Sequence, residues 1–98
     1  MAKGPESHLK AKVKKHLASL PRCRQSWPVP VGYGDQMVDC IACINGRYVA
    51  IETKAEGKKP TPRQWRFLHE VTAAGGVAFW CDSFESYLVT MRDNGLLD

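Results

Sequence analysis

The sequence predicts an α/β domain in which a mixed β-sheet is flanked by helices, with the elements in the order α-β-β-β-α-β-α. Three features indicate this: an apolar stripe at helical spacing near the N-terminus, a hairpin turn at Asn45-Gly46, and a helix followed by a short apolar strand in the second half of the chain. Alternation of this kind is typical of layered α/β folds. A chain of 98 residues fits one domain, so we expect residues 1–98 to form a single unit.

Residues 5–20 are expected to form the first helix, because apolar side chains recur there at spacings of four and three. These side chains are Leu9, Val13, Leu17 and Leu20. Pro21 follows directly and should end the helix. Residues 23–31 contain Pro28 and Pro30, and a strand with two prolines belongs at a sheet edge.

The Asn45-Gly46 pair is a strong signal for a two-residue hairpin turn, since it lies between two runs rich in branched side chains. We therefore expect Val38–Ile44 and Arg47–Lys54 to pair as antiparallel strands. When the register is counted outward from the turn, Asp39 faces Glu52. A shift of one residue would separate these two acids.

The second half should contain a helix, a strand and a last helix. Thr61, Pro62 and Gln64 match the cap, first and third positions of a capping box, and Gly75-Gly76 should end that helix. Val77–Cys81 is expected to be a strand inside the sheet. A helix should follow from Ser83 to Asp93, and the side chains expected to face inward from it are Phe84, Leu88 and Met91.

Two acids and an amine are brought together by this register. Directly opposed residues have Cβ atoms about 4.5–5.5 Å apart, so Asp39 and Glu52 should repel each other. Lys54 lies two residues beyond Glu52 and should share its face. A divalent cation would relieve the remaining repulsion, and magnesium suits such oxygen ligands. The alternative is an ordinary salt-bridge cluster at the open end of a hairpin.

Positive charge is in moderate excess, with 14 lysines and arginines against 10 acids and a formal net charge of +4. The basic residues gather in the first helix and around the start of the second helix. This placement indicates either phosphate contact or a solvated basic surface. The residues expected to contact nucleic acid are Lys10, Lys14, Tyr33, Lys58, Lys59 and Arg63.

The four cysteines are expected to be reduced and mostly buried thiols. Cys40 and Cys43 have the spacing of a metal or redox pair, but within a strand they should point to opposite faces. A zinc or redox protein is therefore a minor alternative. The tryptophans could stack on bases, but in a small domain we expect them in the core; they are Trp27, Trp65 and Trp80.

Asp39 followed by Glu52-Thr53-Lys54 resembles the bipartite signature of PD-(D/E)XK nucleases, with Val38 in place of the proline in the signature's name. The wider series, from about Glu6 to Ser83, is similar to the VRR-NUC family. The further matching segments are Gly34, Asn45-Gly46-Arg47, Val49-Ala50-Ile51, Pro60-Thr61-Pro62-Arg63-Gln64 and Ala73-Ala74-Gly75-Gly76-Val77-Ala78.

This resemblance implies a restriction-endonuclease-like core and a structure-selective DNA endonuclease that cuts branched, flap or junction DNA. Asp39, Glu52 and the Thr53 carbonyl would hold Mg²⁺, for which Mn²⁺ could substitute. Such an ion would orient a water molecule and lower its pKa. Lys54 would position or deprotonate that water and neutralise the phosphate.

Three further acid and amide positions carry alternatives. Gln64 matches a glutamine that supports the site in the family, but it also fits the capping box. Glu6 matches an acid that contacts the metal or its waters in relatives, but it also fits a helix-dipole partner. Asp35 is an alternative to Asp39, which we prefer because it opposes Glu52.

The resemblance also implies a homodimer, because related stand-alone members, from phages and bacteria, form dimers. The alternative function is a nucleic-acid-binding module that uses the nuclease scaffold without cutting. No apolar run approaches the ~20 residues that cross a bilayer, and residues 1–6 lack a secretory signal, so we expect a cytoplasmic protein without a membrane partner.

Overall fold

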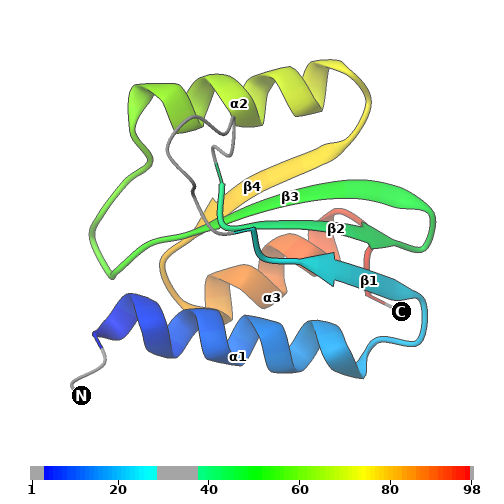
Figure 1. The fold of residues 1–98 in the computed structure, drawn as a ribbon, viewed down its shortest axis with the longest axis horizontal. Helices are drawn as coiled ribbons and strands as arrows, with labels where there is room; N and C mark the ends of the chain where they lie inside the picture. The colour runs from blue at the N-terminus through cyan, green and yellow to red at the C-terminus, as the bar shows by residue number, and fades with distance from the viewer. Residues whose placement is uncertain (1–3, 29–37, 98) are drawn as a thin grey trace.

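The structure, a computed structural model, describes residues 4–28 and 38–97. The elements are α1 (Pro5–Ser19), β1 (Cys23–Ser26), β2 (Cys40–Ile44), β3 (Arg47–Thr53), α2 (Pro62–Ala73), β4 (Val77–Cys81) and α3 (Phe84–Asp93). Their order is the predicted α-β-β-β-α-β-α (Figure 1). None of the helices in the described ranges is long and apolar enough to span a bilayer.

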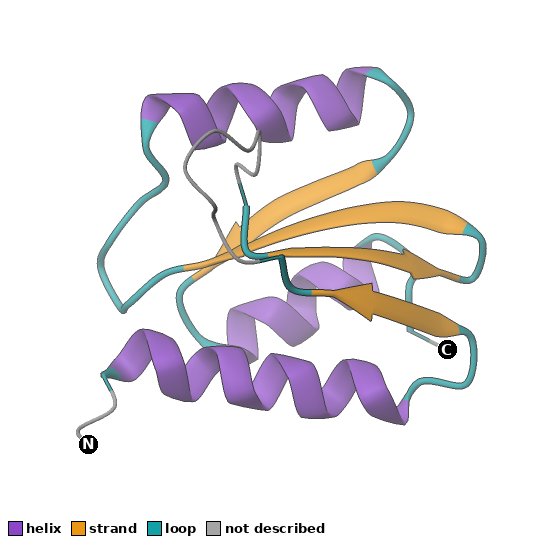
Figure 2. Cartoon of the chain, in the orientation of Figure 1, coloured by secondary structure: helices purple, strands orange, loops and turns teal. Residues whose placement is uncertain are grey.

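The four strands form one mixed sheet in the order β1-β2-β3-β4. β1, β2 and β3 pair antiparallel, whereas β3 and β4 pair parallel. Helix α2 covers one face of the sheet, and α1 and α3 cover the other (Figure 2). β1 lies at one edge of the described sheet, as predicted for the segment with two prolines, but it ends at Ser26, before the first of them. Trp27 and Pro28 of the predicted segment are not in a strand, and its residues 29–31 lie outside the described residues. β4 lies at the other edge, so the expectation that Val77–Cys81 is inside the sheet is wrong: β4 pairs with β3 alone among the described strands.

The hairpin has the predicted register. Asn45-Gly46 makes the turn with φ angles of 53° and 81°, which glycine and asparagine tolerate best. The ladder runs from this turn to the pair of Cys40 and Ile51. The strands are shorter than predicted at their open ends: β2 begins after Asp39, and β3 ends before Lys54. Asp39 and Lys54, two of the three residues of the predicted acid–amine cluster, therefore lie just outside the strands, whereas Glu52 lies within β3.

The main core lies between the sheet and the α1–α3 layer. Leu9, Val13 and Leu17 of α1 are buried against the sheet, as their spacing predicted. The inward face of α3 differs from the prediction: Tyr87 is fully buried along with Met91, whereas Phe84 and Leu88 are partly buried. Phe84 and Leu88 pack against the main core but are not enclosed by it.

Tyr87 is tolerated in the core because its hydroxyl has a polar partner. The hydroxyl lies 2.8 Å from Nδ1 of His16, and the two rings pack edge to face. This contact joins α3 to α1 below the sheet. Burial raises the pKa of the Tyr87 phenol and lowers that of the His16 imidazole, so both groups favour their neutral forms.

A smaller core lies between the sheet and α2. It consists of Val38, Ala50, Leu68 and Val71. The N-terminus of α2 has the predicted capping box: Thr61 Oγ1 accepts from the Gln64 N–H, and the Gln64 side chain accepts from the Thr61 N–H. The capping box fixes the start of α2 over the C-terminal ends of β3 and β4.

Candidate active site

Glu52 is a buried acid near the C-terminal end of β3, with only 2% of its surface exposed. Its Oε1 accepts a hydrogen bond of 3.0 Å from the backbone N–H of Asp39. Its Oε2 lies 2.9 Å from the Gln64 amide nitrogen and 3.1 Å from Nζ of Lys54. A buried carboxylate must be compensated in this way, because removal from water strongly disfavours its charge.

Asp39 lies beside Glu52 but is not arranged as the extended ladder predicted. Its backbone, rather than its side chain, faces the Glu52 carboxylate. Its Oδ2 accepts from the Thr53 backbone N–H at 3.1 Å and from the Thr53 hydroxyl at 2.6 Å. By alternation along β3, the Thr53 side chain projects from the face opposite to Glu52. The Asp39 carboxylate is therefore directed toward the Thr53 side of the sheet. It does not lie next to the Glu52 carboxylate on the same face.

Each of the two acids is paired with a lysine. Lys54 Nζ contacts Glu52, and only 15% of the Lys54 side chain is exposed. Lys10 Nζ, from α1, lies 3.4 Å from Oδ1 of Asp39 and 3.5 Å from Oε2 of Glu6. The Lys10 side chain is 37% exposed. Lys10 was predicted to contact nucleic acid, and the structure places it against an acid of the site.

Gln64 makes contacts that fit both of the roles between which the sequence left a choice. Its Oε1 accepts from the Thr61 backbone N–H, and its Nε2 donates to Glu52. Because a backbone N–H is only a donor, it requires the amide oxygen and leaves the NH₂ group for the carboxylate. The helix cap thus orients a hydrogen-bond donor toward Glu52.

Glu6 is separated from the other acids by the Lys10 ammonium group, which bridges Glu6 and Asp39. Among residues 4–28 and 38–97, no three His, Cys, Asp or Glu side chains are grouped so that they could hold a metal ion. The Thr53 N–H donates toward Asp39, and within a strand the carbonyl of the same residue points to the same side. Asp39, Glu52 and the Thr53 carbonyl thus all present oxygen atoms at this edge.

The environment of Glu52 makes its ionisation less favourable than it is in water. Burial is the main cause of its raised pKa, and the nearby charge of Asp39 raises it further. The hydrogen bond and charge of Lys54 and the Asp39 N–H oppose this shift without cancelling it. Burial also lowers the pKa of Lys10, but the charges and hydrogen bonds of Asp39 and Glu6 outweigh burial and leave it raised.

The expected nucleic-acid contacts are distributed around this site. Lys14 Nζ lies 5.1 Å from the centre of the Trp27 ring, in a cation–π contact at the other end of α1 from Glu6. Lys58, Lys59 and Arg63 are exposed before and at the start of α2. Contact of these basic residues with nucleic acid stays a prediction. Tyr33 and the alternative acid Asp35 lie outside the described residues.

The expectation that the tryptophans are core residues is wrong for Trp65, which is 38% exposed on α2. Trp27 and Trp80 are partly buried and pack against the two cores. Helical spacing places Trp65 on the flank of α2, one position from the buried face, so its ring is only partly covered.

The cysteines are free thiols, but they are not all buried: Cys40 and Cys81 are buried, whereas Cys43 is exposed. Cys40 and Cys43 point to opposite faces, as predicted. Burial raises the pKa of the Cys40 and Cys81 thiols to about 12, so both stay protonated at neutral pH. Thiolates are the form that binds zinc or attacks disulfides, so these two cysteines do not suit either role.

Two contacts of the site had no signal in the sequence. The Thr53 hydroxyl bond to Asp39 depends on the turn of the chain before β2. The ion pair of Lys10 with Asp39 joins residues that are far apart in sequence, and only the packing of α1 against the sheet brings them together. The i, i+4 spacing of Glu6 and Lys10 was the one part of this cluster that the sequence could have indicated.

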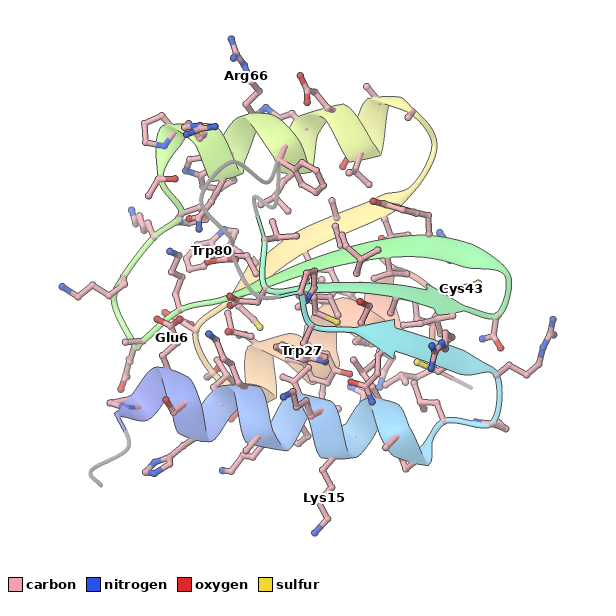
Figure 3. The ribbon with its side chains drawn as sticks, in the orientation of Figure 1. Glu6, Lys15, Trp27, Cys43, Arg66 and Trp80 are labelled. Atoms are coloured by element: carbon pink, nitrogen blue, oxygen red, sulfur yellow. The ribbon has the colours of Figure 1, made fainter. Side chains whose placement is uncertain are left out.

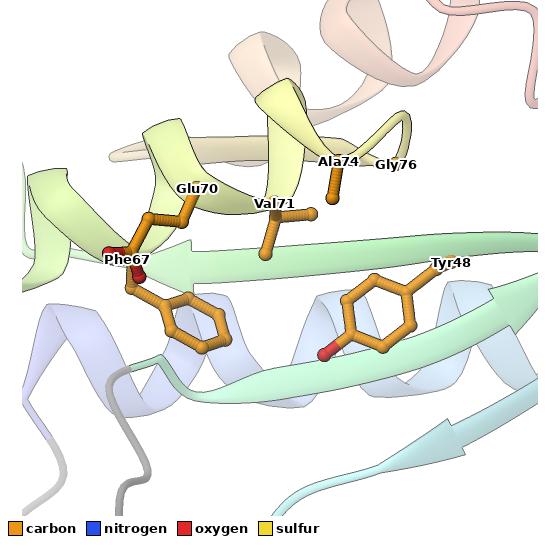
Figure 4. Close-up of a pocket in the computed structure, with 6 residues that line it drawn as sticks. All are labelled: Tyr48, Phe67, Glu70, Val71, Ala74 and Gly76. Carbon is orange, nitrogen blue, oxygen red and sulfur yellow. The ribbon is translucent and has the colours of Figure 1, made fainter.

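An apolar groove of about 370 Å³ lies between α2 and the sheet, away from these acids (Figure 4). It is lined by Tyr48, Phe67, Glu70, Val71, Ala74 and Gly76. Tyr48 lies near the start of β3 and Glu52 near its end, so the groove and the acid site occupy different ends of that strand. The groove contains no residue of the candidate site.

The fold and the acid–amine cluster define an α/β domain with its polar site at the C-terminal ends of β3 and β4. A search found no matching family model and no matching curated protein. A solved structure described as a VRR_NUC domain superposes with a TM-score of 0.75 over 93% of this chain and 97% of that chain, at 19% sequence identity. The chain therefore has the fold of a VRR_NUC domain, and the fold that the resemblance implied is confirmed.

The raised pKa of Glu52 predicts how stability depends on pH. As pH rises above the ordinary carboxyl pKa, the unfolded chain ionises first while folded Glu52 keeps its proton. The free energy of unfolding therefore falls until the folded carboxyl also ionises. Glu52→Gln removes this dependence. Urea unfolding between about pH 4 and pH 8 should show the variant gaining stability relative to the wild type as pH rises. The gain in the free energy of unfolding should be about 1.4 kcal/mol for each unit by which folding raises the Glu52 pKa.

The matched control is Glu70→Gln, since Glu70 is an exposed acid on α2. It should differ from the wild type by a nearly constant amount across this range. A constant difference for Glu52→Gln as well would show that Glu52 ionises normally in the folded chain.

Proposed function

We propose that this protein is a metal-dependent nuclease that hydrolyses phosphodiester bonds in structured DNA, with Mg²⁺ as its ion. The supporting observation is that Glu52, an acid held in a buried setting, lies next to Asp39 and contacts Lys54 at the edge of a VRR_NUC-type fold. The fold is a nuclease-type fold, and the residues at this edge match the nuclease signature. The net charge of +4 suits a polyanionic substrate.

The oxygen donors suit a hard divalent ion. Both lone-pair positions of Asp39 Oδ2 are used by Thr53, whereas Oδ1 contacts only the Lys10 ammonium among the described residues. Glu52 Oε1 accepts one described hydrogen bond and has capacity for another ligand. These two oxygens and the Thr53 carbonyl would hold Mg²⁺, with water and substrate oxygens completing its shell. When bound, the ion would supply Lewis acidity and lower the pKa of a bound water.

The chain's own residues supply orientation and charge. Gln64 and the Asp39 N–H hold the Glu52 carboxylate in one direction. Lys54, anchored by Glu52, presents its remaining N–H donors to a phosphate oxygen or to the attacking water. Its low exposure keeps this donor in a partly dry setting, where electrostatic contacts are strongest.

A non-catalytic nucleic-acid-binding module is the second candidate function. The observation that favours it is that Lys10 and Lys54 already neutralise both acids. Binding of branched DNA without cleavage in any divalent metal would support this second function. Against it stands the raised pKa of Glu52, because a binding surface has no use for a buried acid.

A homodimer is part of the proposal, since two sites would allow both strands of a branched or duplex substrate to be cut. Symmetry would make the two sites equivalent. Light scattering should give twice the mass of the 11.0 kDa chain. A monomer at micromolar concentration would contradict this part of the proposal.

Lys54→Met tests the catalytic assignment, because it keeps the apolar stem and removes the charge. We expect cleavage of flap and junction DNA in Mg²⁺ to fall by about 100- to 1,000-fold, which is typical of the loss of one transition-state donor. Cleavage by the wild type should stop in EDTA. Lys15→Met is the control, because Lys15 is exposed on α1 and points away from the sheet (Figure 3). Wild-type rates in Lys54→Met would refute the role of Lys54.

Lys10→Met tests the metal site without measuring cleavage. The Lys10 ammonium contacts the Asp39 oxygen that would bind the ion, so it should compete with the ion and repel it. We expect calorimetric titration with Mn²⁺ to give about tenfold tighter binding, or ~1.4 kcal/mol, in the variant. Lys15→Met should bind as the wild type does. Unchanged or weaker binding in Lys10→Met would place the ion elsewhere.

A further inference from the structure

An aromatic pair lies beside the acid site. Trp80 of β4 is aligned with Glu52 in the parallel ladder, so both side chains project from the α2 face of the sheet. Trp65 follows Gln64, whose amide contacts Glu52. The ring centroids of the two tryptophans are 6.2 Å apart, with an angle of 79° between the planes. Trp80 therefore lies beside Glu52 in the sheet, and Trp65 is joined to this region through its contact with Trp80.

The two rings have different surroundings. Trp80 is partly buried and packs against the smaller core between α2 and the sheet, below α2 in Figure 3. Trp65 is 38% exposed and lies edge to face against Trp80. His69, one turn further along α2, lies 6.0 Å from the Trp65 ring. The contacts with Trp80 and His69 hold Trp65 in place while part of it faces solvent.

The charge around Trp65 indicates the kind of partner that covers it. Arg63 and Arg66 are exposed on the same helix, and Lys58 and Lys59 are exposed on the segment before it. Figure 3 shows Arg66 projecting from α2 away from the sheet. The acid of α2, Glu70, lines the apolar groove on another side of the helix. An exposed aromatic ring on a helix that also carries two exposed arginines suits a nucleotide, with its flat base and its phosphates.

We propose that Trp65 stacks on an unpaired base of the substrate next to the scissile phosphate. This inference rests on the proposed nuclease function and narrows its substrate: among structured DNAs, those with at least one unpaired base at the cut site are bound most tightly. In a continuous duplex both faces of each base are covered by neighbouring bases, so an indole has no face to contact. A flap, bulge, loop or single strand provides a free face.

The test measures binding of the full chain in EDTA, which stops metal-dependent cleavage. Fluorescence anisotropy compares a labelled duplex carrying one bulged thymine with the same duplex carrying an abasic bulge. We expect the wild type to bind the thymine bulge about 5- to 100-fold more tightly, the range for one stacked base. Trp65→Ala should lose this preference and bind both substrates as weakly as the wild type binds the abasic one.

Tyr48→Ala is the matched control, because Tyr48 is another exposed aromatic residue, at the start of β3. It should keep the preference for the thymine bulge. Equal binding of the two substrates by the wild type would overturn the proposal without any variant. An equal loss of affinity for both substrates in Trp65→Ala would overturn it as well. Such a result would show that the Trp65 ring contributes to binding whether or not the bulged base is present.

The inference and the proposed function fail in different ways. A base preference that depends on Trp65, without cleavage in any divalent metal, would retain the stacking role and reject the nuclease. Cleavage that depends on Lys54, without a base preference, would retain the nuclease and reject the stacking role.

Discussion

The site depends on one buried carboxylate, that of Glu52, which needs partners from three parts of the chain. The Asp39 N–H comes from the segment before β2, the Gln64 amide from α2, and the Lys54 ammonium from the residue after β3. Removing any one of these partners would leave a buried charge less compensated, which typically costs about 1–3 kcal/mol. The acid thus fastens the hairpin to α2 and also concentrates polar groups at one edge of an otherwise apolar sheet.

The topology explains why these groups meet at that edge. β3 and β4 run parallel, so their C-terminal ends lie together, and the chain enters α2 after β3 through a capped helix start. The capping box uses the oxygen of the Gln64 amide, which leaves its nitrogen free for the acid. A feature that begins a helix therefore also orients Glu52. The amide oxygen of Gln64 caps the helix while its amide nitrogen contacts Glu52, so one side chain can make both contacts at once.

The sequence predicted those parts of the fold and site that depend on local rules. The Asn45-Gly46 turn set the register, and the capping box set the start of α2. Local rules failed where distant segments decide the outcome. The turn of Asp39 toward Thr53 depends on how the chain enters β2, and burial of Tyr87 depends on His16 across the α1–α3 contact. Periodicity indicates which face of a helix is apolar, but it does not show which polar atom of another helix will satisfy a buried hydroxyl.

The two lysines of the site differ in how firmly they are held, and this difference separates their roles. Lys54 is mostly buried and has a fixed partner in Glu52. Lys10 is more exposed and shares its charge between Glu6 and Asp39 at longer distances. Exposed ion pairs contribute only ~0–1 kcal/mol, so a divalent ion or a phosphate could displace Lys10 from Asp39 at small cost. Displacing Lys54 would leave Glu52 without its cation in a buried setting. Lys54 is therefore the firmly held charge of the site, and Lys10 is the charge whose ion pairs are weak enough to be displaced.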